Sequence, residues 1–242
     1  MNILILQHIK IEDPGYIKDL MIKDGAKLKT IELDEGEKIP KDLEIYDAML
    51  CMGGPMDTWM EKDYPWLIDE KKRIKEFVID LKKPYLGFCL GCQLLGEVVG
   101  GKVVKSRNPE IGIMDINFSE NKNNDILFSE FPNLIKTLQW HSYEVQNLEN
   151  NKDIKLIASS PETKYQIFKY QNHAYGIQFH IEIKSTTVNE WGCVPEYKLA
   201  LENQLGEGAL EKFDNDAKVN MKNMNKYSKI LYTKFKKDIL KL

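Results

Sequence analysis

Long apolar segments are missing from this sequence of 242 residues, and so is a strong excess of one charge. No run approaches the roughly 18 consecutive apolar residues of a membrane-spanning helix, so we expect no membrane partner. The 34 basic and 37 acidic side chains leave a formal net charge of −3, which gives no reason to expect a nucleic-acid partner. The apolar run after Met1 lacks a basic flank and is too short for a signal peptide, so it predicts a buried first strand.

Cysteine and histidine are also scarce, with four of each. A chain of this length in which 43% of the residues are hydrophobic can bury a large core and does not depend on disulfide bonds. We therefore expect reduced thiols and a cytoplasmic location. No group of His, Cys and acidic residues has metal-ligand spacing, so we predict no metal and no other cofactor.

Internal repeats and linkers rich in Gly, Ser or Pro are absent as well, which indicates one domain over residues 1–242. Short apolar runs predict strands at 3–6, 28–33, 48–52 and 85–88. Amphipathic segments at 15–23 and 66–81 predict helices, and the second is expected to bury Ile68, Ile74, Phe77, Val78 and Leu81. The alternation predicts an α/β fold with an open, mostly parallel, flavodoxin-like sheet flanked by helices.

After residue 102 the pattern changes to strands and turns. Strands are predicted at 111–118, 155–158, 166–170 and 174–179, and the sheet is expected to contain additional antiparallel strands. From about residue 196 the chain is predicted to be helical, and residues 217–242 contain eight lysines and a single acid, Asp238. An apolar stripe at helical spacing favours a helix docked on the domain, and a docking surface for an acidic partner is the alternative; the stripe consists of Met224, Tyr227, Leu231, Phe235 and Ile239.

The most informative segment is 87–93, because it places Cys89 where a strand turns sharply into a helix. Gly87 and Gly91 flank the cysteine at the two positions where a side chain would collide with neighbouring backbone. Such an elbow lifts the thiol out of the sheet toward a helix N-terminus, whose partial positive charge favours the thiolate. This is the geometry of a nucleophile. The helix is predicted over 94–99, and Cys92, which completes a C-x-x-C spacing with Cys89, is expected to be a buried small residue.

A nucleophilic thiol needs a base and a group that orients the base. His180 follows an apolar strand, and Glu182 can point to the same side of an extended chain. The carboxylate can then accept a hydrogen bond from one ring nitrogen and leave the other facing the thiol. Gly53-Gly54-Pro55 follows another predicted strand, and it is either a turn or the source of an N–H that, with the N–H of Leu90, stabilises an oxyanion.

These segments resemble the class I, or triad, glutamine amidotransferases. The resemblance rests on G-x-C-x-G-x-Q around Cys89 and G-x-Q-F-H-x-E around His180. It extends from the first strand to about Trp191 and is strongest for the free-standing branch similar to the glutaminase domain of GMP synthase, through 53–56, 64–67, 110–112, 138–141 and 158–160. The family usually has proline between the His and the Glu, whereas this chain has Ile181. Isoleucine also favours an extended backbone, so we expect the triad to survive.

The resemblance implies specific roles. Cys89 would attack the side-chain amide carbon of glutamine, His180 would carry a proton to the departing ammonia, and Glu182 would hold the imidazole. The implied oxyanion donors are the N–H groups of Gly54 and Leu90, and the implied substrate-binding residues are Gly53, Gln93, Ser142 and Tyr143.

The acceptor of the ammonia would sit on another chain, such as a synthetase subunit in trans. The segment from Gly96 to Lys102 comes close to a phosphate-binding loop, but Val103 stands where a Ser or Thr would hold Mg²⁺. No second domain is predicted that could activate an acceptor.

Three functions are consistent with the sequence. The first is a glutaminase that hydrolyses L-glutamine and supplies ammonia to a partner. The second is a stand-alone γ-glutamyl hydrolase or peptidase that uses the same thiol on γ-glutamyl compounds. The third is a catalytically silent α/β domain used for binding or regulation, against which the intact Cys89, His180 and Glu182 argue.

Overall fold

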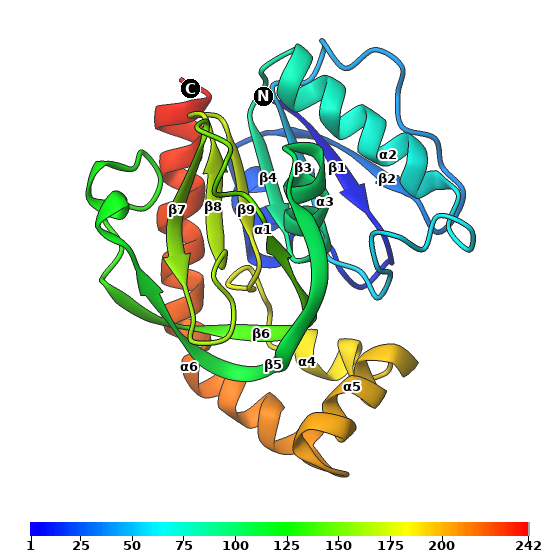
Figure 1. Ribbon diagram of the computed structural model, residues 1–242, viewed down its shortest axis with the longest axis vertical. Coiled ribbons are helices and arrows are strands. Elements are labelled where there is room, and N and C mark those ends of the chain that lie inside the picture. The colour runs from blue at the N-terminus through cyan, green and yellow to red at the C-terminus, as the bar shows by residue number, and fades with distance from the viewer. Residues whose placement is uncertain (242) are drawn as a thin grey trace.

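The computed structural model describes residues 1–241, and within them a nine-stranded sheet has the strand order β2-β1-β3-β4-β9-β8-β7-β5-β6 (Figure 1). Five neighbouring strands pair in parallel: β2 (Lys27–Glu32), β1 (Asn2–Gln7), β3 (Ala48–Cys51), β4 (Tyr85–Phe88) and β9 (Ala174–Ile177). The sheet continues in antiparallel fashion through β8 (Ile167–Tyr170), β7 (Ile154–Ser159), β5 (Lys102–Phe118) and β6 (Leu134–Gln146). The predicted α/β class is confirmed, with a curled mixed sheet.

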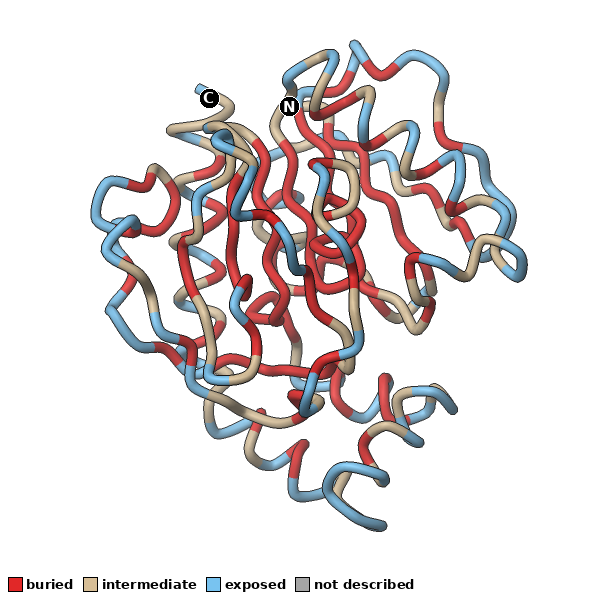
Figure 2. The backbone as a smooth tube through the Cα atoms, in the orientation of Figure 1, coloured by how far each residue is buried: buried red, intermediate tan, exposed pale blue. Residues whose placement is uncertain are grey.

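Helices cover both faces of the parallel part of this sheet. Successive side chains of a strand point to opposite faces, so Ile3 and Ile5 of β1 pack in one core with α1 (Gly15–Lys23) and α6 (Ala209–Lys234). Leu4 and Leu6 pack in the other core with α2 (Trp66–Lys75) and α3 (Leu90–Val98). The central strands are buried over almost their whole length (Figure 2). None of the helices in residues 1–241 is long and apolar enough to cross a membrane.

The helices depart from the sequence-based predictions in two places. The segment 66–81 forms α2 and then a π-helical turn, Glu76–Asp80, and it exposes Ile68 while Leu67 points inward. The prediction that Ile68 is buried is therefore wrong. Helix α3 begins at Leu90, immediately after the elbow, rather than at Leu94.

One long strand, β6, is not predicted by the sequence pattern. Its polar residues Lys136, Thr137, Gln139 and His141 interrupt any apolar alternation, yet most of the strand is buried. Strand β6 pairs with β5 along nearly its whole length and also forms an isolated bridge between Leu138 and His180. Long-range pairing, not local hydrophobic pattern, specifies this strand.

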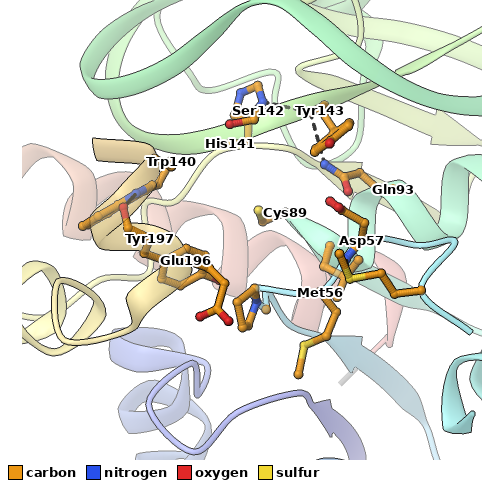
Figure 3. Close-up of a pocket in the computed structure, with 15 residues that line it drawn as sticks. Met56, Asp57, Cys89, Gln93, Trp140, His141, Ser142, Tyr143, Glu196 and Tyr197 are labelled. Carbon is orange, nitrogen blue, oxygen red and sulfur yellow. Dashed lines mark hydrogen bonds between the residues drawn. The ribbon is translucent and has the colours of Figure 1, made fainter. Parts of the chain in front are cut away.

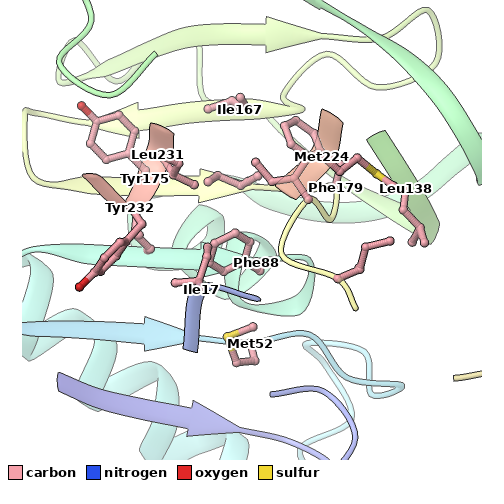
Figure 4. Close-up of a cluster of buried hydrophobic side chains, with 14 of the residues drawn as sticks. Ile17, Met52, Phe88, Leu138, Ile167, Tyr175, Phe179, Met224, Leu231 and Tyr232 are labelled. Atoms are coloured by element: carbon pink, nitrogen blue, oxygen red, sulfur yellow. The ribbon is translucent and has the colours of Figure 1, made fainter. Parts of the chain in front are cut away.

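The carboxyl-terminal segment forms α4 (Thr187–Trp191), α5 (Pro195–Leu205), α6 and a final π-helical turn, Phe235–Ile239. Helix α6 packs in the core through Met224 and Leu231, as the apolar stripe predicts (Figure 4). Phe235, at the start of the final turn, is also buried in this core. The buried hydroxyl of Ser228 donates a hydrogen bond of 2.6 Å to the carbonyl oxygen of Ile181. The interpretation as a docked helix is confirmed.

Truncating Met224 should therefore destabilise the fold. We expect Met224→Ala to lower the free energy of unfolding by about 2–5 kcal/mol, because it removes a wholly buried side chain and leaves a cavity. Lys222→Ala, at an exposed position of the same helix, should change it by no more than about 0.5 kcal/mol. Urea denaturation followed by circular dichroism measures both, and equal effects would contradict the docking of α6.

Candidate active site

The elbow at Cys89 has the sharp geometry that the sequence predicts. The backbone of Cys89 has φ 49° and ψ −103°, and its N–H donates to the carbonyl oxygen of Ile177 at 2.9 Å. A methyl group added at Gly87 would lie 2.4 Å from the carbonyl oxygen of Gly91, and one added at Gly91 would lie 2.2 Å from that of Cys51. Both positions therefore require glycine, because a Cβ atom would overlap main-chain atoms.

His180 and Glu182 form a buried hydrogen-bonded pair beside the elbow. The imidazole Nδ1 lies 2.6 Å from Glu182 Oε1, and the side chains are 2% and 3% exposed. The N–H of Ile181 donates to Glu182 Oε2 at 2.9 Å. Proline has no N–H, so isoleucine supplies a hydrogen bond to this carboxylate that the usual residue could not. The edge-to-face contact of the imidazole with Trp191, at 4.6 Å between ring centroids, also restrains the ring.

The surroundings of His180 favour the protonated, imidazolium form of its side chain. Burial by itself would lower the pKa of His180, but the Glu182 carboxylate and the contact with Cys89 together raise it well above its ordinary value. The side-chain amide of Gln178 also contacts the thiol, with Nε2 3.6 Å from Cys89 Sγ. The imidazole and the Gln178 amide therefore both contact the sulfur of Cys89.

Cys89 faces a cavity of about 220 Å³. Figure 3 shows the sulfur near its centre, with Asp57 and Gln93 on one side and Trp140 and Tyr197 on the other. The lining includes most of the residues expected from the sequence: Gly54, Leu90, Gln93, Ser142 and Tyr143. Gln93 Nε2 donates to the carbonyl oxygen of Tyr143 at 3.2 Å. Gly53 is set back from the cavity, and its carbonyl oxygen contacts His8 instead.

Several acidic and aromatic groups at the site were not predicted from the sequence. Asp57 lines the cavity, and partial burial raises its pKa to about 6. Glu12 is buried, accepts a hydrogen bond from the Tyr197 hydroxyl and interacts electrostatically with His180. Glu12 and Asp57 follow β1 and β3 at the carboxyl edge of the parallel strands, where ligands bind in such sheets, so their positions were a usable signal. Tyr197 comes from α5 and carried no such signal.

One cluster has the proximity of a metal site. His8, Cys51 and Glu70 each bring a potential ligand atom to within 4.8 Å of the others, although they are far apart in the sequence. These atoms already contact one another, with His8 Nε2 2.9 Å and Cys51 Sγ 3.4 Å from Glu70 Oε1. Burial, reinforced by the charge of Glu70, raises the pKa of Cys51 well above its ordinary value. A protonated thiol that contacts Glu70 favours a hydrogen-bonded cluster rather than a metal ligand set.

Comparison with known proteins gives the class of this molecule. The family model for class-I glutamine amidotransferases matches residues 16–190. The chain belongs to this family of amidohydrolase and amidotransferase enzymes.

Its relatives include components of a known enzyme, and the chain is homologous to the glutaminase subunit of GMP synthases. The glutamine-hydrolysing GMP synthase subunit of Sulfurisphaera tokodaii is 30% identical over 177 residues, which cover 71% of this chain and 87% of the relative. The corresponding subunit of Ignicoccus hospitalis is 35% identical over 148 residues, which cover 61% of this chain and 72% of that relative. A glutamine amidotransferase structure from Thermotoga maritima superposes with a TM-score of 0.85 and 26% identity over 100% of this chain and 99% of the other. The superposition therefore includes the carboxyl-terminal helices.

The backbone strain at the elbow can be measured by comparing two substitutions. We expect Cys89→Gly to have a free energy of unfolding about 1 kcal/mol higher than Cys89→Ala, because φ 49° and ψ −103° strain a residue with a Cβ. Lys222→Gly and Lys222→Ala, on the exposed side of α6, serve as the matched control and should show the opposite order. An alanine variant that is the more stable one at both positions would contradict the elbow geometry.

Proposed function

We propose that this chain hydrolyses the side-chain amide of glutamine through a thioester on Cys89, with His180 and Glu182 completing a catalytic triad. The observation that carries the proposal is the buried contact of His180 with Glu182 beside a strained cysteine that faces a cavity. The cysteine follows β4, whereas the other two residues follow β9, so only the folded chain brings them together.

The proposed reaction has two half-reactions. The sulfur of Cys89 attacks the amide carbon, and the imidazolium of His180 gives its proton to the leaving nitrogen, so that the C–N bond breaks, ammonia departs and a γ-glutamyl thioester forms. Water then attacks the thioester and transfers a proton to His180. The C–S bond breaks, glutamate leaves, and the proton remains on the Cys89–His180 pair for the next cycle. Glu182 keeps the imidazole oriented throughout, with its carboxylate held by Ile181.

Two backbone donors are proposed to stabilise the tetrahedral intermediates. The N–H groups of Gly54 and Leu90 make no hydrogen bond to another group within residues 1–241, and both residues line the cavity beside Cys89. A preorganised donor of this kind contributes about 3–4 kcal/mol of transition-state stabilisation.

The cavity also has features that fit the amino-acid end of glutamine. Asp57 and Glu196 contribute carboxylates to the described lining, which contains no lysine or arginine. We assign the substrate α-ammonium group to Asp57, whose raised pKa reflects a partly buried carboxylate without a cationic partner. Gln93 and the backbone at Ser142 and Tyr143 are proposed to hold the α-carboxylate end.

The proposed acceptor chemistry lies on a partner chain. The GMP synthase subunit of Sulfurisphaera tokodaii matches over 87% of its own length, and by analogy we propose a synthetase subunit that receives the ammonia. The four cysteines are free, which suits a reducing compartment such as the cytoplasm.

Substitutions in the proposed triad should have graded effects on ammonia release from glutamine. Cys89→Ala should abolish it, and His180→Gln should lower kcat by about 10³–10⁴-fold because the proton carrier is lost. Glu182→Gln should lower kcat less than His180→Gln does, because Trp191 still restrains the imidazole. Cys193→Ala, at an exposed free cysteine, is the control and should leave the rate unchanged.

The same assay should include γ-glutamyl dipeptides. Preference for glutamine supports the glutaminase, whereas preference for the dipeptides would replace it with a γ-glutamyl hydrolase. Labelling of Cys89 by a glutamine-like electrophile without turnover of any substrate would show that an activating partner is required. Turnover that survives in Cys89→Ala would refute the proposal.

Binding of glutamine should depend on the ionisation of Asp57. Because the pKa of Asp57 is raised to about 6, the carboxylate is charged above that pH and neutral below it. The KM for glutamine should therefore rise as the pH falls through about 6. Asp57→Asn should have a high KM at every pH, while Glu196→Gln, at an exposed carboxylate of the same cavity, should keep the wild-type dependence. A pH-independent KM in the wild type would exclude this role for Asp57.

A further inference from the structure

We propose that His8, held by Glu70, is a positioning residue that fixes the Gly53–Gly54 peptide with its N–H directed at the cavity beside Cys89. Neither residue lines the cavity, so both act through the peptide rather than on the substrate. The inference rests on the proposed function, because it concerns the backbone donor assigned there to the oxyanion.

The protonation of the His8 imidazole follows from its partners. Nδ1 lies 2.8 Å from the carbonyl oxygen of Gly53, which can only accept, so Nδ1 carries the hydrogen. Nε2 lies 2.9 Å from Glu70 Oε1. Both side chains are wholly buried, and the imidazole stacks on Trp66 at 5.6 Å between ring centroids. The ring is therefore restrained from three directions.

The contact with Gly53 also sets the direction of the Gly54 N–H. The C=O of Gly53 and the N–H of Gly54 belong to one peptide unit, and no peptide bond among residues 1–241 is cis. In a trans peptide these two groups point in opposite directions. A carbonyl held against His8 thus turns the N–H away from His8. Gly54 lies between His8 and Leu90 and lines the cavity beside Cys89.

The two glycines make such a restraint necessary. A methyl group added at Gly53 would lie 2.0 Å from Glu12 Oε2, and one added at Gly54 would lie 2.8 Å from His8 Cβ, so neither position has room for a side chain. Two adjacent glycines rotate more freely than other residues. A rotated peptide would present its carbonyl oxygen to the developing oxyanion. His8 supplies the restraint that the glycines lack.

The Glu70 carboxylate completes the arrangement. Burial alone would lower the pKa of His8, but Glu70 and the Gly53 carbonyl outweigh it and raise the pKa, so the imidazolium is favoured. A charged donor at the carbonyl oxygen makes the stronger hydrogen bond and polarises the peptide, which improves its N–H as a donor. Because Glu70 belongs to α2 and His8 follows β1, this pair ties the loop to two separate elements.

Two variants of nearly equal shape test the proposal. His8→Asn places an amide nitrogen where Nδ1 lay and can still donate to Gly53, whereas His8→Leu cannot, and both lose the contact with Glu70. We expect His8→Leu to lower kcat for glutamine by about 10²–10³-fold with little change in KM, and His8→Asn to recover about 10-fold or more of that loss. Equal kcat values in His8→Leu and the wild type would overturn the proposal.

Alkylation of Cys89 by iodoacetamide separates positioning from general damage. This displacement forms no oxyanion, so both variants should alkylate at the wild-type rate. Binding of glutamate γ-semialdehyde, whose hemithioacetal with Cys89 places an oxygen at the proposed donors, should weaken in His8→Leu and be restored in His8→Asn. Equal losses of kcat in both variants together with slowed alkylation would show a merely structural role and overturn the proposal.

A measurement on the wild-type protein needs neither turnover nor a folded variant. Nitrogen-15 NMR of the histidine side chains should show His8 Nδ1 protonated at neutral pH, with a coupling across the hydrogen bond to the Gly53 carbonyl carbon. An unprotonated Nδ1 would overturn the inference even if glutamine is hydrolysed. A protonated, coupled Nδ1 in a protein that hydrolyses no γ-glutamyl compound would uphold the restraint and refute the proposed function instead.

Discussion

The tight packing of the elbow against both neighbouring strands is the constraint on which the site depends. The N–H of Cys89 is held by Ile177 of β9, and the N–H of Gly91 donates to Met52, just after β3, at 3.0 Å. With β4 between β3 and β9, the strand order brings the Gly53–Gly54 loop to one side of the cysteine and His180 to the other. Three segments that are distant in the sequence therefore meet at one edge of the sheet, as open α/β sheets favour.

The carboxyl-terminal helices also hold the residues of the site in place. The family match ends at residue 190, yet Ser228 of α6 holds the backbone of Ile181 between the two proposed triad residues. Tyr197 of α5 lines the cavity and donates to Glu12 beside His180. Helix α5 thus forms part of the cavity wall, and α6 holds the backbone between His180 and Glu182. The packing of α6 is therefore linked to the geometry of the proposed triad.

Much of the parallel half of the fold and the proposed triad could be predicted from the sequence, because local signals specify them. Short apolar runs separated by amphipathic segments identify β1 to β4. The spacing of glycines around Cys89 identifies the elbow. Strand β6 could not be found, since its burial comes from pairing with β5 and not from an apolar pattern of its own. Tyr197 could not be predicted for a related reason: it belongs to no motif, and only the folded chain brings it to the cavity. Glu12 and Asp57 differ, because their positions after β1 and β3 were a signal that could have been used.

The central claim is that a γ-glutamyl thioester forms on Cys89, and acid quenching during turnover tests it most directly. Wild-type protein mixed with carbon-13-labelled glutamine, quenched and digested, should yield a labelled adduct on the peptide that contains Cys89. The adduct should disappear in Cys89→Ala and persist in Cys193→Ala. Labelled glutamyl adducts on another residue, or ammonia release that continues in Cys89→Ala, would contradict the account.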